Sequence, residues 1–585
     1  MKRTRRASLR LTLTMVMVFL VVLVFTGRLF QLQVVQAAAL NKISARNQST
    51  TVVTPGIRGS IVDANGVVLA QSVDRFNLTV APKEFLAGYD KVAGDHNTLV
   101  PVSASIARIS KVTGISTSDL TAIVDKDPSS LYAILAKNLD LATVAKLKKL
   151  AIPGLYYPSV PARSYPNGAI AGNLVGFVGT DGPQAGMETE YDKCLASTAG
   201  RATYQTGQDG VRIPGSTVKQ TDPINGGTLQ LTIDSQLQYQ VQTAITKQAQ
   251  VLGAPWATAV ITRVSDGHLM TVADYPSVDP NDPGATAGKN QGSLAFTQQY
   301  EPGSTFKAMS ASALIDAGAI TPTTHVVVPS VLRLSNGGYI KDSFSHGTLH
   351  YTTAGVLENS SNIGISLLSE NLDAKSRFDY MVKFGVGQKT AVDFPGQASG
   401  HLGKPPWDVV TTKSVEFGQG VSATSVQVAQ IFQTIANHGV REPLTLVQQC
   451  TAPDGTVTDT PTAKPTRVVS TNTADEVRGM LETVVSGGPV GSLLRIPGYR
   501  IAAKTGTAQV ANANGAGYGK NYIISVAGMI PAENPQYVVV VTFGPTTLGT
   551  SAGAAPAFKN VMMDVIDRYR IPPSTTSAPY VRTTW

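Results

Sequence analysis

A serine and a lysine three positions apart are the first residues of this sequence that could do chemistry together. They are Ser304 and Lys307, in the segment YEPGSTFK at positions 300–307. The Pro-Gly pair breaks the preceding element and helix formers follow as far as Gly318, so Ser304 is predicted in the first turn of a helix, with Lys307 on the same face. The hydroxyl would lie among unpaired backbone N–H groups, beside an amine that could accept its proton. A serine can act as a nucleophile in this setting without a histidine.

A second copy of the pattern, from Ser216 to Lys219, shows how little the spacing alone proves. It is followed by Gln, Thr, Asp, Pro and a pair of glycines, which cannot continue a helix. Ser216 therefore lacks the setting that would activate its hydroxyl. Without further motifs, Ser304 would equally fit an ordinary helix N-cap.

Two later segments carry residues that could complete such a site. The first is Ser360-Ser361-Asn362, at a break between two apolar helical stretches, and the second is Lys504-Thr505-Gly506-Thr507, on a strand predicted to begin at Tyr499. Because a strand alternates its faces, Lys504 should point away from Thr505, and Gly506 should let a ligand backbone approach closely. Each segment alone also fits a turn or a solvated strand, and Ser369-Glu370-Asn371 repeats the Ser-x-Asn pattern.

The elements that must position these residues are strands and helices. Residues 51–221 contain short elements, including a hairpin signal at 58–70, but no pattern for a nucleophile or a metal site. Beyond them we expect a strand at 228–233, a helix capped by Asp234, a hairpin over 257–273, strands at 499–509, 522–530 and 537–544, and a closing helix over 558–569. This order predicts an α+β domain, in which helices cover one antiparallel sheet and an all-helical insertion runs from Ser304 to about Asn437.

The N-terminus predicts a membrane anchor. Residues 11–27 carry no charge and are bounded by Arg10 and Arg28, and five basic residues precede them. The basic cluster would keep the N-terminus in the cytoplasm and place the rest of the chain outside the membrane. A cleaved signal peptide with a processing site at Ala37–Ala39 is the alternative, but those alanines lie well beyond the apolar run and beyond Arg28.

Composition argues against several other classes of function. The formal net charge is +9, but much of it comes from residues 1–10, so nucleic-acid binding is not supported. No His-Glu-x-x-His occurs, and His346 and His350 enclose no acid, so no metal site is predicted. Cys194 and Cys450 are far apart in the sequence, which favours free buried thiols over a disulfide.

Together, the motifs at Ser304, Ser360 and Lys504 resemble the Ser-x-x-Lys, Ser-x-Asn and Lys-Thr-Gly set of penicillin-binding proteins and class A β-lactamases. The resemblance to class B, high-molecular-mass penicillin-binding proteins extends along nearly the whole chain, through the anchor and the segments 58–59, 163–168, 186–192, 231–234, 418–427, 436–439 and 556–558. That family commonly reads Ser-Ser-Asn-x-Gly, as at 360–364, which selects Ser360 over Ser369.

The resemblance implies an order of parts along the chain. These are a cytoplasmic tail (1–10), a transmembrane anchor (11–30), a linker (31–50), an elongated pedestal or dimerisation-like module (51–221), a penicillin-binding transpeptidase domain (226–571) and a disordered tail (572–585). The domain would hold a five-stranded antiparallel sheet covered by helices, together with an all-helical subdomain.

The resemblance also implies acyl transfer on peptidoglycan stem peptides, with no cofactor. Ser304 would be the nucleophile and Lys307 its general base, helped by Ser360 and Asn362. The backbone N–H groups of Ser304 and Thr507 would form the oxyanion hole. Lys504 would take part in the site, and Thr505, Gly506 and Thr507 would bind the substrate. β-Lactams would acylate the same serine.

The resemblance favours the cell-division branch of this family over the elongation branch. Expected partners are the lipid-linked precursor, a membrane peptidoglycan glycosyltransferase and other division proteins. A β-lactam sensor and a catalytically inactive division scaffold remain as alternatives, but sensors usually carry more membrane spans, and the motif set is intact. Ala64, Gln397 and Ala503 depart from the residues common in the family without touching the expected catalytic groups.

Overall fold

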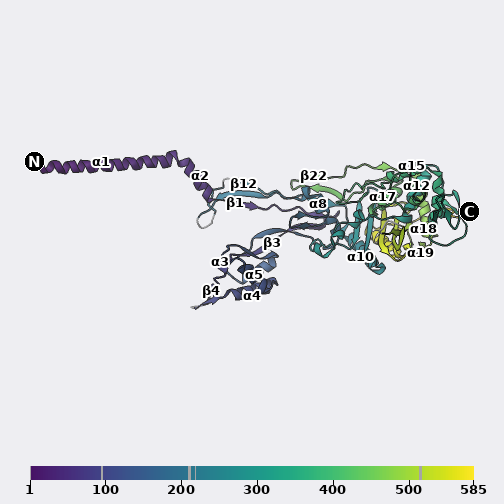
Figure 1. Cartoon of the computed structure of the whole chain (residues 1–585), viewed down its shortest axis with the longest axis horizontal. Helices are drawn as coiled ribbons and strands as arrows, with labels where there is room; N and C mark the ends of the chain where they lie inside the picture. The colour runs from purple at the N-terminus through teal and green to yellow at the C-terminus, as the bar shows by residue number, and fades with distance from the viewer. Residues whose placement is uncertain (1, 94–95, 208–211, 218, 513–516) are drawn as a thin grey trace. The chain divides into compact units, whose positions relative to one another are not determined.

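The computed structural model of the chain describes residues 2–93, 96–207, 212–217, 219–512 and 517–585. Its backbone divides into two units. Figure 1 shows the whole chain, coloured by residue number from the N-terminus to the C-terminus. One unit holds the chain up to Ile57 together with Ser197–Asn225, and the other holds Arg58–Ala196 and Gly226–Trp585. All of the expected site residues belong to the second unit.

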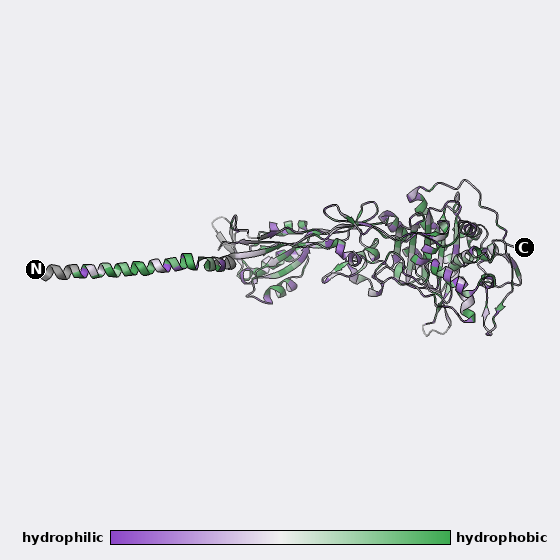
Figure 2. Cartoon of the chain, turned by 90° about the horizontal axis from the view of Figure 1, so that it is seen from above, coloured by the Kyte–Doolittle hydropathy of each residue, from purple (hydrophilic) through white to green (hydrophobic). Residues whose placement is uncertain are grey.

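The first unit begins with an apolar helix, α1 (Lys2–Phe30). The stretch Leu9–Val35 has a mean hydropathy of 2.4 and no buried residues, and is long enough to cross a membrane (Figure 2). The predicted anchor at 11–30 lies inside it. A π-helical turn (Gln31–Val35) and α2 (Ala37–Gln48) lead to a three-stranded antiparallel sheet, in the order β1 (Ser49–Thr54), β11 (Gly200–Gln205) and β12 (Lys219–Thr221).

In the second unit, residues 58–164 are built on the long strand β3 (Val68–Val80), which follows β2 (Ile61–Val62) in the predicted hairpin. A small core packs around Leu78, Ile109 and Leu120. The remaining elements are α3 (Pro82–Phe85), β4 (Tyr89–Ala93), β5 (His96–Val100), α4 (Val102–Thr113), α5 (Thr117–Asp125), β6 (Ala133–Leu139), α6 (Leu141–Lys149), β7 (Leu155–Tyr156) and β8 (Ser159–Ser164).

A buried glutamate joins three of the segments that the sequence singled out. Glu188, on α8 (Gly186–Glu190), accepts hydrogen bonds from Arg58 Nε at 2.8 Å and from Arg163 Nε at 2.6 Å. Arg163 also donates to the Gly59 carbonyl at 2.6 Å. The Glu188 side chain is fully buried, so its charge depends on these two guanidinium groups.

The predicted five-stranded antiparallel sheet is confirmed, in the order β15-β14-β26-β25-β24. Its strands are β14 (Trp256–Arg263), β15 (Leu269–Tyr275), β24 (Ala502–Ala511), β25 (Tyr518–Ile530) and β26 (Tyr537–Thr546). The helices α10 (Ser235–Leu252) and α20 (Ala555–Tyr569) pack with one face of the sheet, and α17 (Ser425–Ala436) contacts β14 and β26. Asp234 caps α10 as expected, with its carboxylate accepting from Leu237 N at 3.2 Å.

The strand expected at 228–233 belongs to a different sheet. β13 (Thr228–Leu231) pairs in parallel with β2 and antiparallel with β21 (Val447–Thr451), which in turn pairs with β22 (Val457–Thr458). Local sequence indicates a strand here, but its partners come from distant segments.

The insertion between Ser304 and Asn437 is largely helical, with α12 (Lys307–Asp316), α13 (Thr353–Glu358), α14 (Asn362–Leu368), α15 (Ala374–Lys383), α16 (Val409–Ser414) and α17. It is not all-helical as expected. Four short strands form two ribbons, β16 (His325–Val328) with β19 (Leu349–Thr352) and β17 (Leu332–Arg333) with β18 (Tyr339–Ile340). β-Branched residues at 326–328 favour a strand there.

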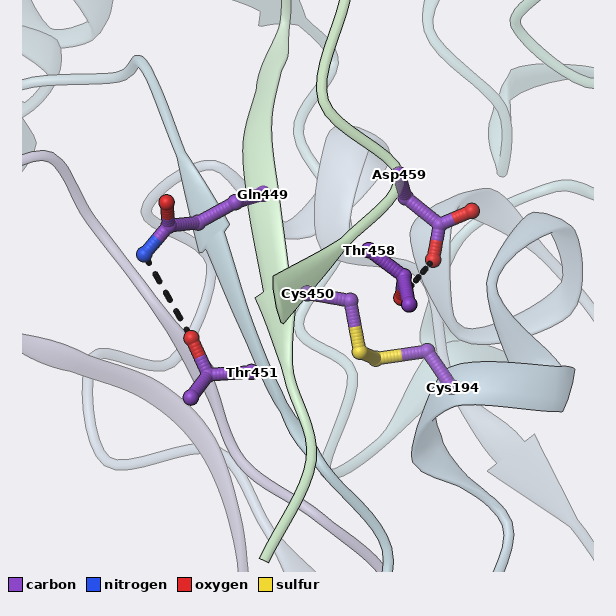
Figure 3. The surroundings of a disulfide bond; sticks show 6 residues. All are labelled: Cys194, Gln449, Cys450, Thr451, Thr458 and Asp459. Carbon is purple, nitrogen blue, oxygen red and sulfur yellow. Dashed lines mark hydrogen bonds between the residues drawn. A yellow bond between two sulfur atoms is a disulfide. The ribbon is translucent and has the colours of Figure 1, made fainter. Parts of the chain in front are cut away.

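The expectation of free thiols is wrong, because Cys194 and Cys450 form a disulfide (Figure 3). Cys194 lies on α9 (Asp192–Leu195) and Cys450 on β21, with their Cα atoms 6.3 Å apart. The start of β13 and the residue before it lie beside both cysteines: Leu229 pairs with Cys450, and Gly227 N donates to the Cys194 carbonyl at 2.8 Å. A sequence separation of 256 residues gave no sign of this proximity.

The tail at 572–585, expected to be disordered, is held by hydrogen bonds along its length. Ser574 N donates to the Gly498 carbonyl at 2.8 Å, and Trp585 Nε1 donates to the Tyr351 carbonyl at 3.0 Å. Its Pro-, Ser- and Thr-rich composition is typical of disorder, but its backbone finds partners on the domain surface. Two further helices of the domain are α18 (Thr471–Ser486) and α19 (Gly491–Leu494).

Candidate active site

Ser304 lies in a tight turn that leads into a helix, close to the predicted arrangement. Gly303–Phe306 form a 3₁₀ turn, and α12 begins at Lys307. Gly303 has a φ of +59° and donates from its N–H to the Gly418 carbonyl at 3.0 Å, which fixes the start of the turn. The side chain of Ser304 is partly exposed, whereas Lys307 is fully buried.

The Lys307 ammonium connects the first two motifs. Its Nζ donates to Ser304 Oγ at 2.8 Å, to Asn362 Oδ1 at 2.7 Å and to the Ser360 carbonyl at 2.6 Å. The predicted nucleophile and base are therefore within hydrogen-bonding distance, and Asn362 orients the base.

Ser360 lies between α13 and α14 and reaches both lysines of the site. Its Oγ is 3.3 Å from Lys307 Nζ and 2.9 Å from Lys504 Nζ. Its φ is +58°, in the left-handed region that non-glycine residues seldom adopt. Such strain persists only where the surrounding structure holds the residue, and it is often found at functional sites.

The third motif lies on β24, at the edge of the five-stranded sheet. Lys504 is fully buried, Thr505 is nearly buried and Thr507 is partly exposed. Half of the backbone N–H groups of an edge strand point away from the sheet, where a ligand can reach them. This edge therefore offers backbone donors beside the nucleophile.

Gly506 packs closely against neighbouring segments of the chain. A Cβ atom there would clash with Ser525 Oγ of β25, and would lie 3.0 Å from the Pro302 carbonyl oxygen and 3.0 Å from Thr305 Cγ2. The missing side chain thus makes room for Ser525 and for the turn that carries Ser304, and its expected contact with a substrate stays a prediction. Likewise, a Cβ atom on Gly303 would lie 2.9 Å from the Thr507 carbonyl oxygen, so the turn and the strand pack closely together.

The two buried lysines have depressed pKa values. Desolvation lowers the pKa of Lys307 well below its usual value of 10.5; the charge of Lys504 lowers it further, while Asp342 opposes the shift. Desolvation lowers the pKa of Lys504 to about 7. A depressed pKa leaves a larger share of the Lys307 amine neutral at a given pH, and only the neutral amine can accept a proton from Ser304.

Asp342 is a site residue that sequence reasoning missed. Its buried carboxylate accepts from Ser361 Oγ at 2.7 Å, from Ile363 N at 3.0 Å and from His346 Nε2 at 3.1 Å. It thus holds the start of α14, where Asn362 lies, and is the acid that faces Lys307. It follows β18 in an irregular segment, and no local pattern marks it.

Glu301, three residues before the nucleophile, links two neighbouring segments to its turn. Its carboxylate accepts from Gly420 N at 2.9 Å and from the Tyr518 hydroxyl at 3.1 Å. Burial raises the pKa of Glu301. The contact with Tyr518 ties β25 to the segment that carries Ser304.

The two competing serines lie in unsuitable settings. Ser216 is in a turn, where its hydroxyl donates to the Ile213 carbonyl at 2.6 Å, and the chain then enters β12 rather than a helix. Ser369 is fully buried and donates to the Ser366 carbonyl at 2.8 Å. The Ser369 hydroxyl has no lysine amine among its described hydrogen-bond partners, and the side chain of Lys219, the lysine of the second pattern, lies outside the described residues.

This geometry suits acyl transfer through a serine ester. A partly exposed hydroxyl contacts a buried amine, a second hydroxyl bridges two amines, and backbone donors lie at a strand edge nearby. Within the described ranges, no three His, Cys, Asp or Glu side chains gather as a metal site requires.

Comparisons with known proteins agree with this arrangement. Residues 257–563 match the family described as "Penicillin binding protein transpeptidase domain", and residues 53–231 match "Penicillin-binding Protein dimerisation domain". The chain is 34% identical to the penicillin-binding protein PbpB of Mycolicibacterium smegmatis over 96% of its own length and 90% of that protein. It is 28% identical to the peptidoglycan D,D-transpeptidase FtsI of Escherichia coli over 94% of its length and 90% of that protein.

Solved structures show the same fold. Penicillin-binding protein 3 from Mycobacterium tuberculosis, in complex with aztreonam, superposes with a TM-score of 0.69 at 28% identity. The match covers 91% of the chain and 100% of that structure.

Proposed function

The chain belongs to the class B penicillin-binding proteins, and from this premise we propose that it is a peptidoglycan D,D-transpeptidase whose nucleophile is Ser304. The observation that carries the assignment is the 2.8 Å contact between Ser304 Oγ and the buried amine of Lys307. The names of its relatives, a penicillin-binding protein and a D,D-transpeptidase, support the same reaction.

In the first half of the reaction, Ser304 Oγ attacks the carbonyl carbon between the two terminal D-alanines of a donor stem peptide. Its proton passes to neutral Lys307 Nζ, which Asn362 and the Ser360 carbonyl hold in place. The negative charge that develops on the carbonyl oxygen is stabilised by the backbone N–H groups of Ser304 and Thr507. The peptide C–N bond then breaks, and the terminal D-alanine leaves with a proton on its nitrogen.

In the second half, an amine of a neighbouring stem peptide attacks the ester carbon. The ester bond to Ser304 breaks, a new amide forms, and the proton lost by the amine returns to Ser304 Oγ. Lys504, Thr505 and Thr507 bind the substrate carboxylate, and Gly506 lets the strand lie against the turn of the nucleophile. Ser360, between the two amines, can relay protons between them.

We place the catalytic domain outside the cytoplasm, anchored by α1. The apolar stretch Leu9–Val35, the basic residues before it and the disulfide, a bond typical of oxidising compartments, support this topology. Cell division is the process that we favour, because FtsI of E. coli is among the relatives of the chain. A membrane peptidoglycan glycosyltransferase and other division proteins are the expected partners.

A fluorescent penicillin tests the nucleophile. The wild-type protein should form a covalent adduct that survives denaturation, and the Ser304→Ala variant should form none. Ser216→Ala is the matched control, because it removes the serine of the same local pattern in a turn that no helix follows. Equal labelling of wild type and Ser304→Ala would refute the assignment, and so would loss of labelling in a folded Ser216→Ala protein.

A further inference from the structure

Residues 572–585, here called the strap, run from the closing helix α20 to the strand that precedes α13. The strap first contacts the segment before β24, where Ser574 N donates to the Gly498 carbonyl at 2.8 Å. Arg500 then donates to Thr576 Oγ1 at 2.7 Å while its guanidinium binds Glu482 of α18 at 2.7 Å. These contacts fix the path of the strap over the domain.

The end of the strap pairs with β19 like an added strand. Thr352 N donates to the Thr583 carbonyl at 3.1 Å, and Trp585 Nε1 donates to the Tyr351 carbonyl at 3.0 Å. The Trp585 indole stacks on His325 of β16, with ring centroids 4.3 Å apart and planes 4° from parallel. The strap therefore holds both strands of the β16–β19 ribbon.

This ribbon leads directly into α13. The Thr352 hydroxyl accepts from Gly355 N at 3.2 Å, which caps the helix, and donates to the Arg582 carbonyl at 2.6 Å. A Cβ atom on Gly355 would clash with the Thr583 carbonyl oxygen. The backbone of the strap thus lies directly against the first turn of α13.

The other end of α13 determines where Ser360 lies. Ser360 N donates to the Leu357 carbonyl at 3.3 Å, and Ser361 N donates to the Val356 carbonyl at 3.0 Å. Because Ser360 has a strained φ of +58°, it depends on its surroundings to keep this conformation. A shift of the short helix α13 would move Ser360 relative to Lys307 and Lys504.

We propose that the strap is a positioning element of the active site, which clamps the start of α13 and so holds Ser360 between Lys307 and Lys504. This inference rests on the proposed function, in which these three residues belong to the acyl-transfer site. A protein that lacks the clamp should still fold, but its serine should be acylated more slowly.

Two kinds of variant release the clamp. Deletion of residues 581–585 and Trp585→Ala remove its end, whereas Gly355→Ala keeps every residue of the strap and displaces it by a steric clash. Trp585→Phe should restore function, because it keeps a ring that can stack on His325. Tyr580→Ala is the matched control, because that aromatic side chain belongs to the strap and is 91% exposed.

Two quantities are measured with a fluorescent penicillin. The first is the rate constant of acylation over about pH 6 to 10, and the second is the final extent of labelling. The releasing variants should react about ten- to a hundredfold more slowly, as expected for a misplaced catalytic group, yet reach full labelling. In these variants, the part of the pH profile in which the acylation rate rises should move to higher pH. A displaced Ser360 would admit water to Lys307, and the weaker desolvation would raise the pKa of this amine. Lys504 and Asp342, the charged groups that face Lys307, would continue to lower and to raise that pKa, respectively.

Unchanged rates and pH profiles in the releasing variants that reach full labelling would overturn the proposal. A lower extent of labelling at an unchanged rate would also overturn it, because this would assign the strap to folding alone. If the truncated protein does not fold, Trp585→Ala and Trp585→Phe provide the same comparison. Failure of the wild type to react at all would instead refute the proposed function.

Discussion

The disulfide between Cys194 and Cys450 should make a measurable contribution to stability. It joins residues 256 positions apart, and in the chain-entropy description a loop of this length corresponds to about 5.5 kcal/mol of stabilisation. Measured contributions are commonly lower, at about 2–4 kcal/mol. The unit that contains it has about 500 residues, so its unfolding entropy is on the order of 1 kcal/mol/K, and loss of the bond should lower Tm by roughly 2–5 °C.

The perturbation is the double variant Cys194→Ala and Cys450→Ala, which avoids burying a new hydroxyl beside Gly227. Thermal unfolding of the catalytic unit is followed with and without dithiothreitol. The reductant should lower Tm of the wild type toward that of the double variant and should leave the double variant unchanged. Two free thiols per chain in the denatured, unreduced protein would refute the reasoning, as would a wild-type Tm that does not respond to reduction.

Further predictions concern the site and its supports. Acylation should rise with pH through a pKa well below 10.5, because Lys307 must be neutral to accept a proton; a midpoint near 10.5 in a pH–rate profile would contradict its role. Asp342→Asn should slow acylation about tenfold. It should also move the rise of the acylation rate to lower pH, because the charge that raises the pKa of Lys307 is lost. Gly506→Ala should reduce acylation by roughly a hundredfold or more through displacement of the nucleophile's turn, and a near-normal rate would argue against that contact. Glu188→Gln should lower the free energy of unfolding, measured with urea, by about 3–5 kcal/mol, whereas Glu190→Gln, at an exposed position, should leave it almost unchanged.

Local sequence was sufficient for the parts of the site that depend on short-range patterns. A Pro-Gly break followed by a run of helix-forming residues indicated the turn of Ser304. Apolar runs rich in β-branched and aromatic residues indicated β25 and β26. The partners of β13 differed, because pairing with β2 and β21 depends on segments far away in the chain, and the four short strands β16–β19 of the insertion were not expected.

The features that the sequence did not reveal depend on tertiary contacts. Asp342 has no motif around it and acquires its role only when α14 begins beside it. The strap has the composition of a disordered tail, but its order comes from carbonyl groups that accept from Thr352 and from one stacked indole. In both cases the local sequence carries no signal, because the residues that contact Asp342 or the strap are distant from them in sequence.

The most direct test of the central claim is to locate the acyl group by mass spectrometry after reaction with benzylpenicillin and digestion with trypsin. Cleavage after Lys289 and Lys307 releases a peptide of residues 290–307 that contains Ser304, and cleavage after Arg212 and Lys219 releases one of residues 213–219 that contains Ser216. The adduct should be found on the first peptide, at Ser304, and should be absent from the Ser304→Ala protein. An adduct on the second peptide, or an unmodified first peptide from fully labelled protein, would contradict the assignment of Ser304 as the nucleophile.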